Sequence, residues 1–228
     1  MERCDVFVVI PAFNENSVIG STVADIVNRG YTAVVVDDGS TVPVENFLIG
    51  LPVYRLRHAI NLGQGAALRT GSDFALLKGA RIIVHFDADG QHDPALIERL
   101  IAPIRSGKAD VALGSRFLTD SDSHEVPAVK RVLLKAGVFV SWVFTGMWLS
   151  DAHNGFRALS RAAAEKIRLE ENGFAHATEI LELVRRSRLT WVEVPVTIHY
   201  TDYSRGKGQS VLNSFNILID LMLRRLFH

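Results

Sequence analysis

Two aspartates, Asp87 and Asp89, have the residue type and spacing best suited to chemistry in this chain. They follow the apolar run 81–85, which predicts a buried strand. In an extended segment, side chains two residues apart point to the same side, so the two carboxylates would repel each other without a cation between them. Mg²⁺ and Mn²⁺ prefer such oxygen ligands. These residues alone leave open a metal site or a solvated turn, and Asp93 with Pro94 predicts the start of the next helix.

The composition narrows the class of protein. A chain of 228 residues that is 48% hydrophobic can form one large α/β domain, and we expect a single domain over residues 1–228. The formal net charge is zero, so no global field attracts nucleic acid. The single cysteine, Cys4, excludes an intrachain disulfide and a cysteine-based zinc site. The sequence enters a strand pattern within a few residues, so we expect no signal peptide and a cytoplasmic protein.

Alternating strands and helices must position the polar residues. The apolar patterns predict strands over 6–10, 33–36, 53–56, 81–85 and 110–113, and helices over 17–29, 63–77 and 94–105. Such alternation predicts a mostly parallel sheet with right-handed crossovers. In such sheets ligands bind beyond the carboxyl ends of the strands, which is where the unusual polar residues of this sequence lie.

The blocks at these strand ends form an ordered set. The set comprises Pro11-Ala12-Phe13-Asn14-Glu15, Asp37-Asp38-Gly39-Ser40, Asn61-Leu62-Gly63-Gln64-Gly65, Asp87-Ala88-Asp89, Gly114-Ser115-Arg116-Phe117 and Asp151-Ala152-His153-Asn154-Gly155-Phe156-Arg157. Over nearly the whole chain it resembles a family 2 glycosyltransferase with the Rossmann-like GT-A fold. The later blocks resemble the branch of dolichyl-phosphate mannose synthase and the bacterial polyprenyl-phosphate glycosyltransferases. The resemblance implies an inverting, metal-dependent transfer of a sugar from a nucleotide-sugar to polyprenyl phosphate.

The resemblance also assigns a donor site. It implies that the nucleotide-sugar is bound by Pro11, Ala12, Phe13, Glu15, Asp37, Asp38, Gly39, Gly63, Gly65, Asp87, Ala88 and Asp89. It places Mg²⁺ or Mn²⁺ on Asp87 and Asp89, with Gln91 as a further ligand, to stabilise charge on the leaving diphosphate. From the residues alone, Asp38 also fits a turn, and Gly63 and Gly65 also fit structural glycines at a helix start.

On the acceptor side, the resemblance implies that Arg116, Arg131, Arg205 and Lys207 bind phosphate groups, which arginine can hold bidentately. A phosphate monoester has its second pKa near ~6 and is already a nucleophile at neutral pH. A sugar hydroxyl instead needs a positioned base. Glu179 and Asp151 are the candidate bases, although the usual Glu-Asp pair is absent.

Three functions therefore stay open. The favoured one is transfer to polyprenyl phosphate, giving a lipid-linked sugar for cell-surface glycans. The second is transfer to a hydroxyl of a lipid-linked or surface glycan, and the third is an inactive nucleotide-sugar binding module. The sequence does not choose between UDP and GDP or identify the sugar.

Two segments predict contact with a membrane. Residues 132–149 are apolar and aromatic, which fits either a buried helix or a helix at the bilayer surface. Residues 210–227 predict an amphipathic helix that is too polar to span, with Arg224 and Arg225 near its end. We expect these segments to hold the protein at the inner face of the cell membrane or against a small membrane protein.

Overall fold

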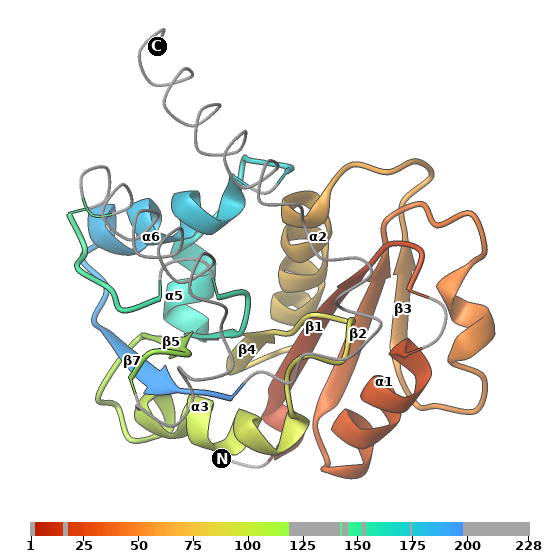
Figure 1. The fold of residues 1–228 in the computed structure, drawn as a ribbon, viewed down its shortest axis with the longest axis horizontal. Helices are drawn as coiled ribbons and strands as arrows, with labels where there is room; N and C mark the ends of the chain where they lie inside the picture. The colour runs from red at the N-terminus through yellow and green to blue at the C-terminus, as the bar shows by residue number, and fades with distance from the viewer. Residues whose placement is uncertain are drawn as a thin grey trace, which may run out of the picture.

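The computed structural model contains one seven-stranded sheet, in the order β3-β2-β1-β4-β6-β5-β7 (Figure 1). The structure describes residues 3–15, 18–118, 142, 146–151, 154–173 and 175–197. The strands are β1 Val6–Ala12, β2 Thr32–Asp37, β3 Tyr54–Arg57, β4 Ile82–His85, β5 Val111–Ser115, β6 Arg157–Ser160 and β7 Trp191–Pro195. Only β6 runs against the others, because it pairs antiparallel with both β4 and β5. The predicted mostly parallel sheet is therefore confirmed.

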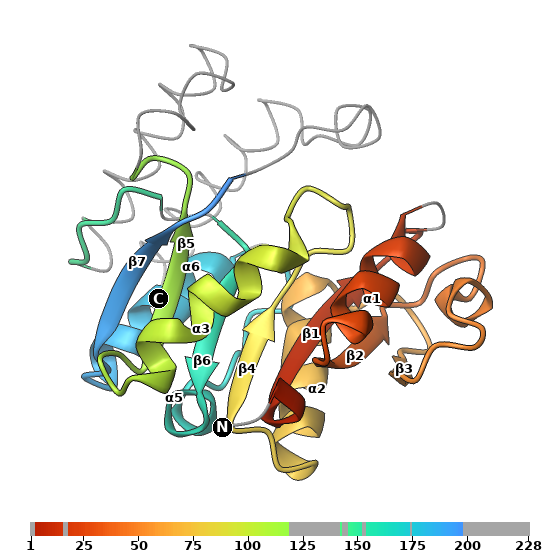
Figure 2. The same ribbon diagram turned by 90° about the horizontal axis from the view of Figure 1, so that it is seen from below.

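Helices cover both faces of the sheet (Figure 2). They are α1 Ile19–Asn28, α2 Gln64–Leu77, α3 Ile97–Arg105, α5 Arg161–Lys166 and α6 His176–Arg186, with short 3-10 turns η1 Arg3–Asp5, η2 Val44–Phe47 and η3 Pro94–Leu96. Apolar side chains of α1 and α3 form the core on one face, and those of α2, α5 and α6 form the core on the other. All seven residues of β1 are buried, which explains its continuous apolar sequence.

The predicted elements hold, with one difference in detail. The five predicted strands and the first two helices are present, with ends shifted by a few residues. The predicted helix 94–105 begins instead as the separate turn η3 and continues as α3. Asp93 is the N-cap of η3, because its carboxylate accepts a hydrogen bond from the backbone N–H of Ala95 at 2.8 Å.

Two strands were not predicted. β6 has only four residues and contains Arg157 and Ser160, so its apolar signal is weak. β7 lies at the edge of the sheet, contains Glu193 and ends at Pro195, a residue that sheets tolerate mainly at edges. β6 begins with the buried Arg157, and the side chain of Glu193 on β7 accepts hydrogen bonds from residues 150 and 151.

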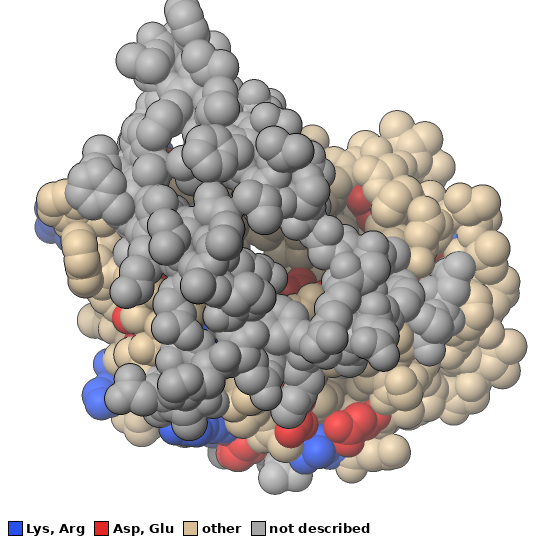
Figure 3. Space-filling model, viewed as in Figure 1, with Lys and Arg blue, Asp and Glu red and all other residues tan. Residues whose placement is uncertain are grey.

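The strand directions bring one set of ends together. The carboxyl ends of β1, β2, β4 and β5 lie at the same edge of the sheet as the amino end of β6. On the surface seen in Figure 3, acidic and basic side chains lie side by side along the lower rim, in keeping with the zero net charge. The polar residues that follow these strands are therefore brought together by the strand directions.

The segments expected at the membrane are largely outside the described residues. Of 132–149 the structure describes only 142 and 146–149, and it describes none of 198–228. Within the described ranges, no helix combines the length and apolarity needed to cross a membrane. The single domain over 1–228 and the helix over 210–227 stay predictions.

Candidate active site

Asp87 and Asp89 lie just beyond the carboxyl end of β4. The Gln64 side chain, at the start of α2, donates to Asp87 Oδ1 at 2.9 Å. Asp89 accepts hydrogen bonds from Gln91 through its backbone N–H at 3.0 Å and its side-chain amide at 2.6 Å. Burial, with the negative charge of Asp89, raises the pKa of Asp87 to about 7, and burial also raises the pKa of Asp89. Among the described residues, the positive charge of Arg157 lowers the pKa of Asp87 but does not offset burial and the charge of Asp89.

This donor set fits a hard divalent cation. Both side chains offer carboxylate oxygens, and a cation between them would counter the burial and the repulsion by Asp89 that together raise the pKa of Asp87. In the described part of the chain, no three His, Cys, Asp or Glu side chains gather as a metal cluster. Mg²⁺ suits such a site, since it usually binds through one or two carboxylates and completes its shell with water and substrate phosphates. Gln91 lies beside Asp89, and its role as a ligand stays a prediction.

Aromatic packing holds Asp87 from the other side. The His92 ring packs against Phe86 and Phe156, with centroid distances of 5.9 Å and 5.0 Å. Its Nε2 lies 3.8 Å from Asp87 Oδ2. Burial lowers the pKa of His92 to about 3, so the ring is neutral at physiological pH. We interpret His92 as part of the rigid wall behind the carboxylate.

Asp37 and Asp38, predicted to meet the nucleoside, shape two loops. Asp38 Oδ1 lies 2.7 Å from His58 Nδ1, and the two carboxylate oxygens of Asp38 accept hydrogen bonds from the backbone N–H groups of Leu62 and Gly63 at 3.0 Å and 2.7 Å. The Asp37 carboxylate accepts hydrogen bonds from backbone N–H groups within the loop that follows β2. Both aspartates therefore organise the floor of the predicted donor site, and a direct nucleoside contact stays a prediction.

Gly63 and Gly65 serve a close backbone approach. Gly63 has φ 105°, and a Cβ there would lie 2.3 Å from the carbonyl oxygen of Asn172. The same oxygen accepts hydrogen bonds from Gly65 N and Ala66 N at 2.8 Å and 3.3 Å. The first amides of α2 therefore face a neighbouring loop. This is the structural role that the sequence left open beside phosphate binding.

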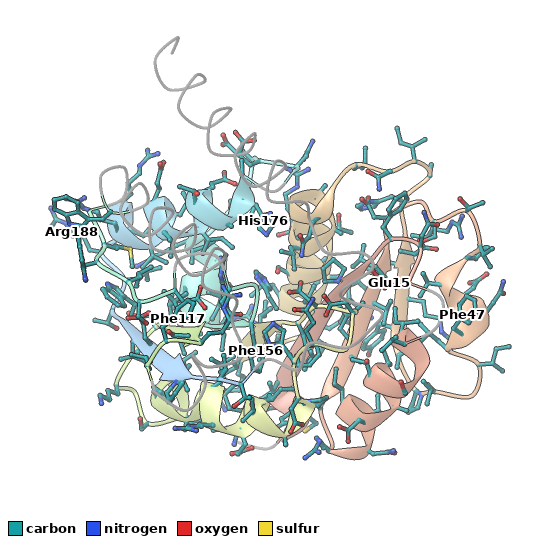
Figure 4. All side chains as sticks on the ribbon, in the orientation of Figure 1. Glu15, Phe47, Phe117, Phe156, His176 and Arg188 are labelled. Atoms are coloured by element: carbon teal, nitrogen blue, oxygen red, sulfur yellow. The ribbon has the colours of Figure 1, made fainter. Side chains whose placement is uncertain are left out.

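The segment after β1 joins the other strand ends. Pro11 and Ala12 are buried within β1, whereas Phe13 is exposed just beyond it. Asn14 links this segment to the β2 loop, because its backbone N–H donates to a serine hydroxyl there at 2.9 Å. Glu15, shown in Figure 4, lies close enough to raise the pKa of both Asp87 and Asp89. The other predicted donor residues lie at the same edge: Gly39 follows Asp38, and Ala88 is buried between the two acidic residues.

Arg116 and Asp151 form a bidentate ion pair on the acceptor side. Arg116 Nε and Nη2 donate to the two oxygens of Asp151 at 2.6 Å and 2.7 Å, and its backbone N–H adds a bond at 3.2 Å. The side chains are 12% and 1% exposed. The structure thus joins a predicted phosphate ligand to a predicted base. Arg131, Arg205 and Lys207 lie outside the described residues.

Glu179, the other candidate base, is directed at a loop. Its carboxylate accepts hydrogen bonds from the backbone N–H groups of Glu170 and Glu171 at 2.8 Å and 3.0 Å. Burial raises its pKa, while these two hydrogen bonds act in the opposite direction. Glu179 therefore orders the loop that also meets the start of α2.

One buried cation, Arg157, belongs to a motif block of the sequence but was assigned no role from it. It begins β6, is 2% exposed, and donates from Nε to the carbonyl oxygen of Asn154 at 2.8 Å. Burial lowers its pKa to about 10, with opposing influences from Asp87 and Asp151, so it stays charged at neutral pH. Its positive charge thus acts on both halves of the site. An arginine inside the apolar run 155–159 was the available signal.

Comparisons with known proteins agree with this arrangement. Residues 7–168 match the family model "Glycosyl transferase family 2". An uncharacterized protein of Methanocaldococcus jannaschii is 37% identical over 230 residues, spanning 100% of this chain and 95% of that protein. The UDP-N-acetylglucosamine–dolichyl-phosphate N-acetylglucosaminyltransferase of Methanococcus voltae is 29% identical, over 97% and 96% of the two chains. The polyprenol monophosphomannose synthase of Mycolicibacterium smegmatis is 30% identical, over 92% and 82%.

A solved structure supports the fold. The glucosyl-3-phosphoglycerate synthase of Mycobacterium tuberculosis, crystallised with Mn²⁺, uridine diphosphate and glucosyl-3-phosphoglycerate, superposes with a TM-score of 0.66. The alignment covers 93% of this chain and 75% of that chain at 19% identity. The predicted GT-A fold is confirmed by this likeness and by the sheet order. With the family match over most of its length, this chain is a glycosyltransferase and belongs to glycosyltransferase family 2.

Proposed function

We propose that this enzyme transfers one sugar, with inversion, from a nucleotide-sugar to polyprenyl phosphate. The observation that carries the proposal is that both candidate bases are engaged by the protein itself. Asp151 is held by the guanidinium of Arg116, and Glu179 is held by two loop amides. An acceptor that needs no base fits this site best.

The chemistry of the two acceptor classes separates the alternatives. A sugar hydroxyl must lose a proton during attack, so a base must lie within hydrogen-bonding reach of it. The oxygens of Asp151 already accept guanidinium hydrogens. A phosphate monoester is largely dianionic at neutral pH, because its second pKa is near ~6. It can attack the anomeric carbon once it is aligned, and alignment is what a fixed arginine supplies.

The relatives support the acceptor class and leave the sugar open. The Methanococcus voltae relative is named for dolichyl phosphate and N-acetylglucosamine, and the Mycolicibacterium smegmatis relative for polyprenol and mannose. A shared lipid phosphate with different sugars favours a polyprenyl phosphate acceptor here. The donor is a UDP- or GDP-sugar.

The residues of the chain divide into two halves in this proposal. Asp87 and Asp89, with Gln91, would hold Mg²⁺ or Mn²⁺, which stabilises negative charge on the leaving nucleotide diphosphate. The loops ordered by Asp37 and Asp38 form the donor side. The basic residues form the acceptor side.

On that side, Arg116 binds the acceptor phosphate, assisted by Arg131, Arg205 and Lys207. The reaction takes place at the cytoplasmic face of the cell membrane, where the lipid phosphate is presented. Attachment there is peripheral, through 132–149 and 210–227, directly or through a small membrane protein. No nucleic acid takes part.

The test is a transfer assay with membranes and a panel of labelled UDP- and GDP-sugars. After lipid extraction, a label that mild acid releases from the organic phase identifies a sugar joined through lipid phosphate. A lipid product whose sugar survives mild acid would instead indicate a hydroxyl acceptor. Nucleotide binding without transfer from any donor would indicate the inactive module.

A further inference from the structure

Glu193, on the edge strand β7, holds the segment that carries Asp151. Its Oε1 accepts hydrogen bonds from Ser150 N at 2.8 Å, from Ser150 Oγ at 2.6 Å and from Asp151 N at 3.3 Å. Bonds to a carboxylate are stronger than bonds between neutral groups. Three donors on one oxygen therefore fasten residues 150 and 151 to β7.

A second attachment runs to β5. The hydroxyls of Ser150 and Ser115 lie 2.5 Å apart, and Ser115 Oγ accepts a hydrogen bond from Phe117 N at 3.2 Å. Ser115 is fully buried at the end of β5. The two strands are neighbours in the sheet, with Leu113 opposite Glu193. The network thus includes both chain neighbours of Arg116, Ser115 and Phe117.

We infer that Glu193 is a positioning residue for the acceptor site, acting through Asp151 on Arg116; the inference rests on the proposed function. Glu193 fixes the backbone of Asp151, and Asp151 fixes the plane of the Arg116 guanidinium through two parallel bonds. A guanidinium held in one plane before the phosphate arrives loses less entropy on binding it. Glu193 itself touches no substrate in this scheme.

The sheet does not need this carboxylate. β7 is joined to β5 by backbone pairing over five residues, from Trp191 to Pro195, and this pairing does not involve the Glu193 side chain. The Glu193 side chain is only partly buried. Its hydrogen bonds therefore serve the 150–151 segment, so removing them should alter the acceptor site while leaving the fold intact.

The variants are Glu193→Leu and Glu193→Gln, with Ser150→Ala as a second way to weaken the network. Glu165→Gln is the matched control, because Glu165 makes an exposed pair with Arg161 one turn away on α5. In Glu193→Leu we expect the KM for polyprenyl phosphate to rise on the order of tenfold, since charged hydrogen bonds are lost. The KM for the nucleotide-sugar should stay at the wild-type value. Glu193→Gln keeps an oxygen that can accept these hydrogen bonds, so its KM for polyprenyl phosphate should lie between the values of wild type and Glu193→Leu.

A second readout needs no activity. Phenylglyoxal modifies accessible arginines, and peptide mass spectrometry gives the rate at Arg116 relative to Arg81, an exposed arginine that neither the network variants nor the control variant alters. The rate at Arg116 should rise in Glu193→Leu and Ser150→Ala and stay at the wild-type value in Glu165→Gln. Wild-type modification of Arg116 in both network variants, with an unchanged acceptor KM, would overturn the inference.

The two readouts keep the proposals separate. A wild-type enzyme that transfers no sugar to polyprenyl phosphate would end the proposed function, while faster Arg116 modification in the variants would still support the positioning of Arg116 by Glu193. A wild-type enzyme that transfers normally, with network variants that match it in both readouts, would end the positioning role alone.

Discussion

Gly155 lies directly against the carboxylate of Asp87. A Cβ at residue 155 would fall 2.5 Å from Asp87 Oδ2 and 3.1 Å from its Cγ. Asp87 cannot move freely away, because Gln64 holds its other oxygen and it is walled in by His92. The absence of a side chain at 155 therefore fixes where the first acidic residue of the site can sit.

We predict that Gly155→Ala lowers kcat/KM at least about tenfold through displacement of Asp87, because catalytic groups act within tight geometric limits. Mn²⁺ affinity, measured by calorimetry, should fall in parallel. Gly173→Ala is the control, since a Cβ at Gly173 meets no atom of the described residues within 4 Å. Equal activity of the two variants would show that Asp87 tolerates the added methyl group.

For the metal, we predict that Asp89→Ala abolishes transfer and greatly weakens metal-dependent nucleotide binding while the protein stays folded. The variant removes one of the two carboxylates that a cation would bridge. Asp93→Ala, which removes a nearby carboxylate whose described role is to cap η3, is the control and should keep its Mn²⁺ stimulation. Titration with Mn²⁺ checks both, and Mn²⁺-stimulated activity in Asp89→Ala would rule out the metal assignment.

The sequence predicted the parts of this molecule that depend on local patterns. Buried parallel strands such as β1 and β2 are continuous apolar runs. Asp87 and Asp89 follow another such strand, β4. A parallel sheet brings such strand ends together, so the location of the site followed.

The residues that were missed depend on long-range pairing. Arg157 and Glu193 lie in short strands whose polar residues hide the pattern, and only their pairing with β4 and β5 brings them to the site. The contact of Gly155 with Asp87 joins residues 68 positions apart, and no local signal carries it. Similarly, Asp151 could be predicted as a candidate base, but its capture by Arg116 could not.

For the buried cation, we predict that Arg157→Met lowers transfer at least about tenfold, because its positive charge acts on both Asp87 and Asp151. The free energy of unfolding should fall by about 1–3 kcal/mol, because Met leaves the carbonyl oxygen of Asn154 without its hydrogen bond and leaves Asp87 and Asp151 without this positive charge. Urea denaturation and kinetics check the two halves. Arg161→Met, an exposed arginine on α5, is the control. Wild-type activity in Arg157→Met would show that the charge of Arg157 does not contribute to transfer.

For the ion pair, we predict non-additive stability in a double-mutant cycle of Arg116→Ala and Asp151→Ala. Arg116→Ala alone should cost about 3 kcal/mol, because it removes two bonds from a buried carboxylate. Adding Asp151→Ala should restore part of that loss. Urea denaturation of the four proteins gives the coupling free energy. All three variants should use the acceptor poorly, and Arg116→Ala should keep its nucleotide affinity. Additive stabilities would contradict a strong pair.

His176 predicts a specific dependence of stability on pH. It begins α6 on the side that faces α2 (Figure 4), and its Nδ1 lies 2.8 Å from the carbonyl oxygen of Gly173. Burial, followed by the positive charge of Arg157, lowers its pKa from 6.5 to about 4. Below pH 6.5 this histidine therefore binds a proton in the unfolded chain but stays neutral in the folded protein. As the pH falls below 6.5, this histidine should lower the free energy of unfolding by up to about 1.4 kcal/mol per pH unit. The loss should level off near pH 4, where the folded protein also binds the proton.

Asp87 acts in the opposite direction, and the pKa values of Asp89, His92 and Glu179 are also shifted, so a single pH profile would mix the effects of several groups. Its raised pKa means that the folded protein binds a proton between about pH 7 and 4 that the unfolded chain does not, which adds stability as the pH falls. The His176→Asn variant isolates the contribution of His176, because the asparagine amide can still donate a hydrogen bond to the carbonyl oxygen of Gly173 but does not titrate. Urea denaturation should be measured at about pH 7.5, 6.5 and 5.5. As the pH falls, wild type should lose stability relative to His176→Asn. Parallel profiles for the two proteins would mean that His176 accepts its proton in the folded state as readily as in the unfolded chain.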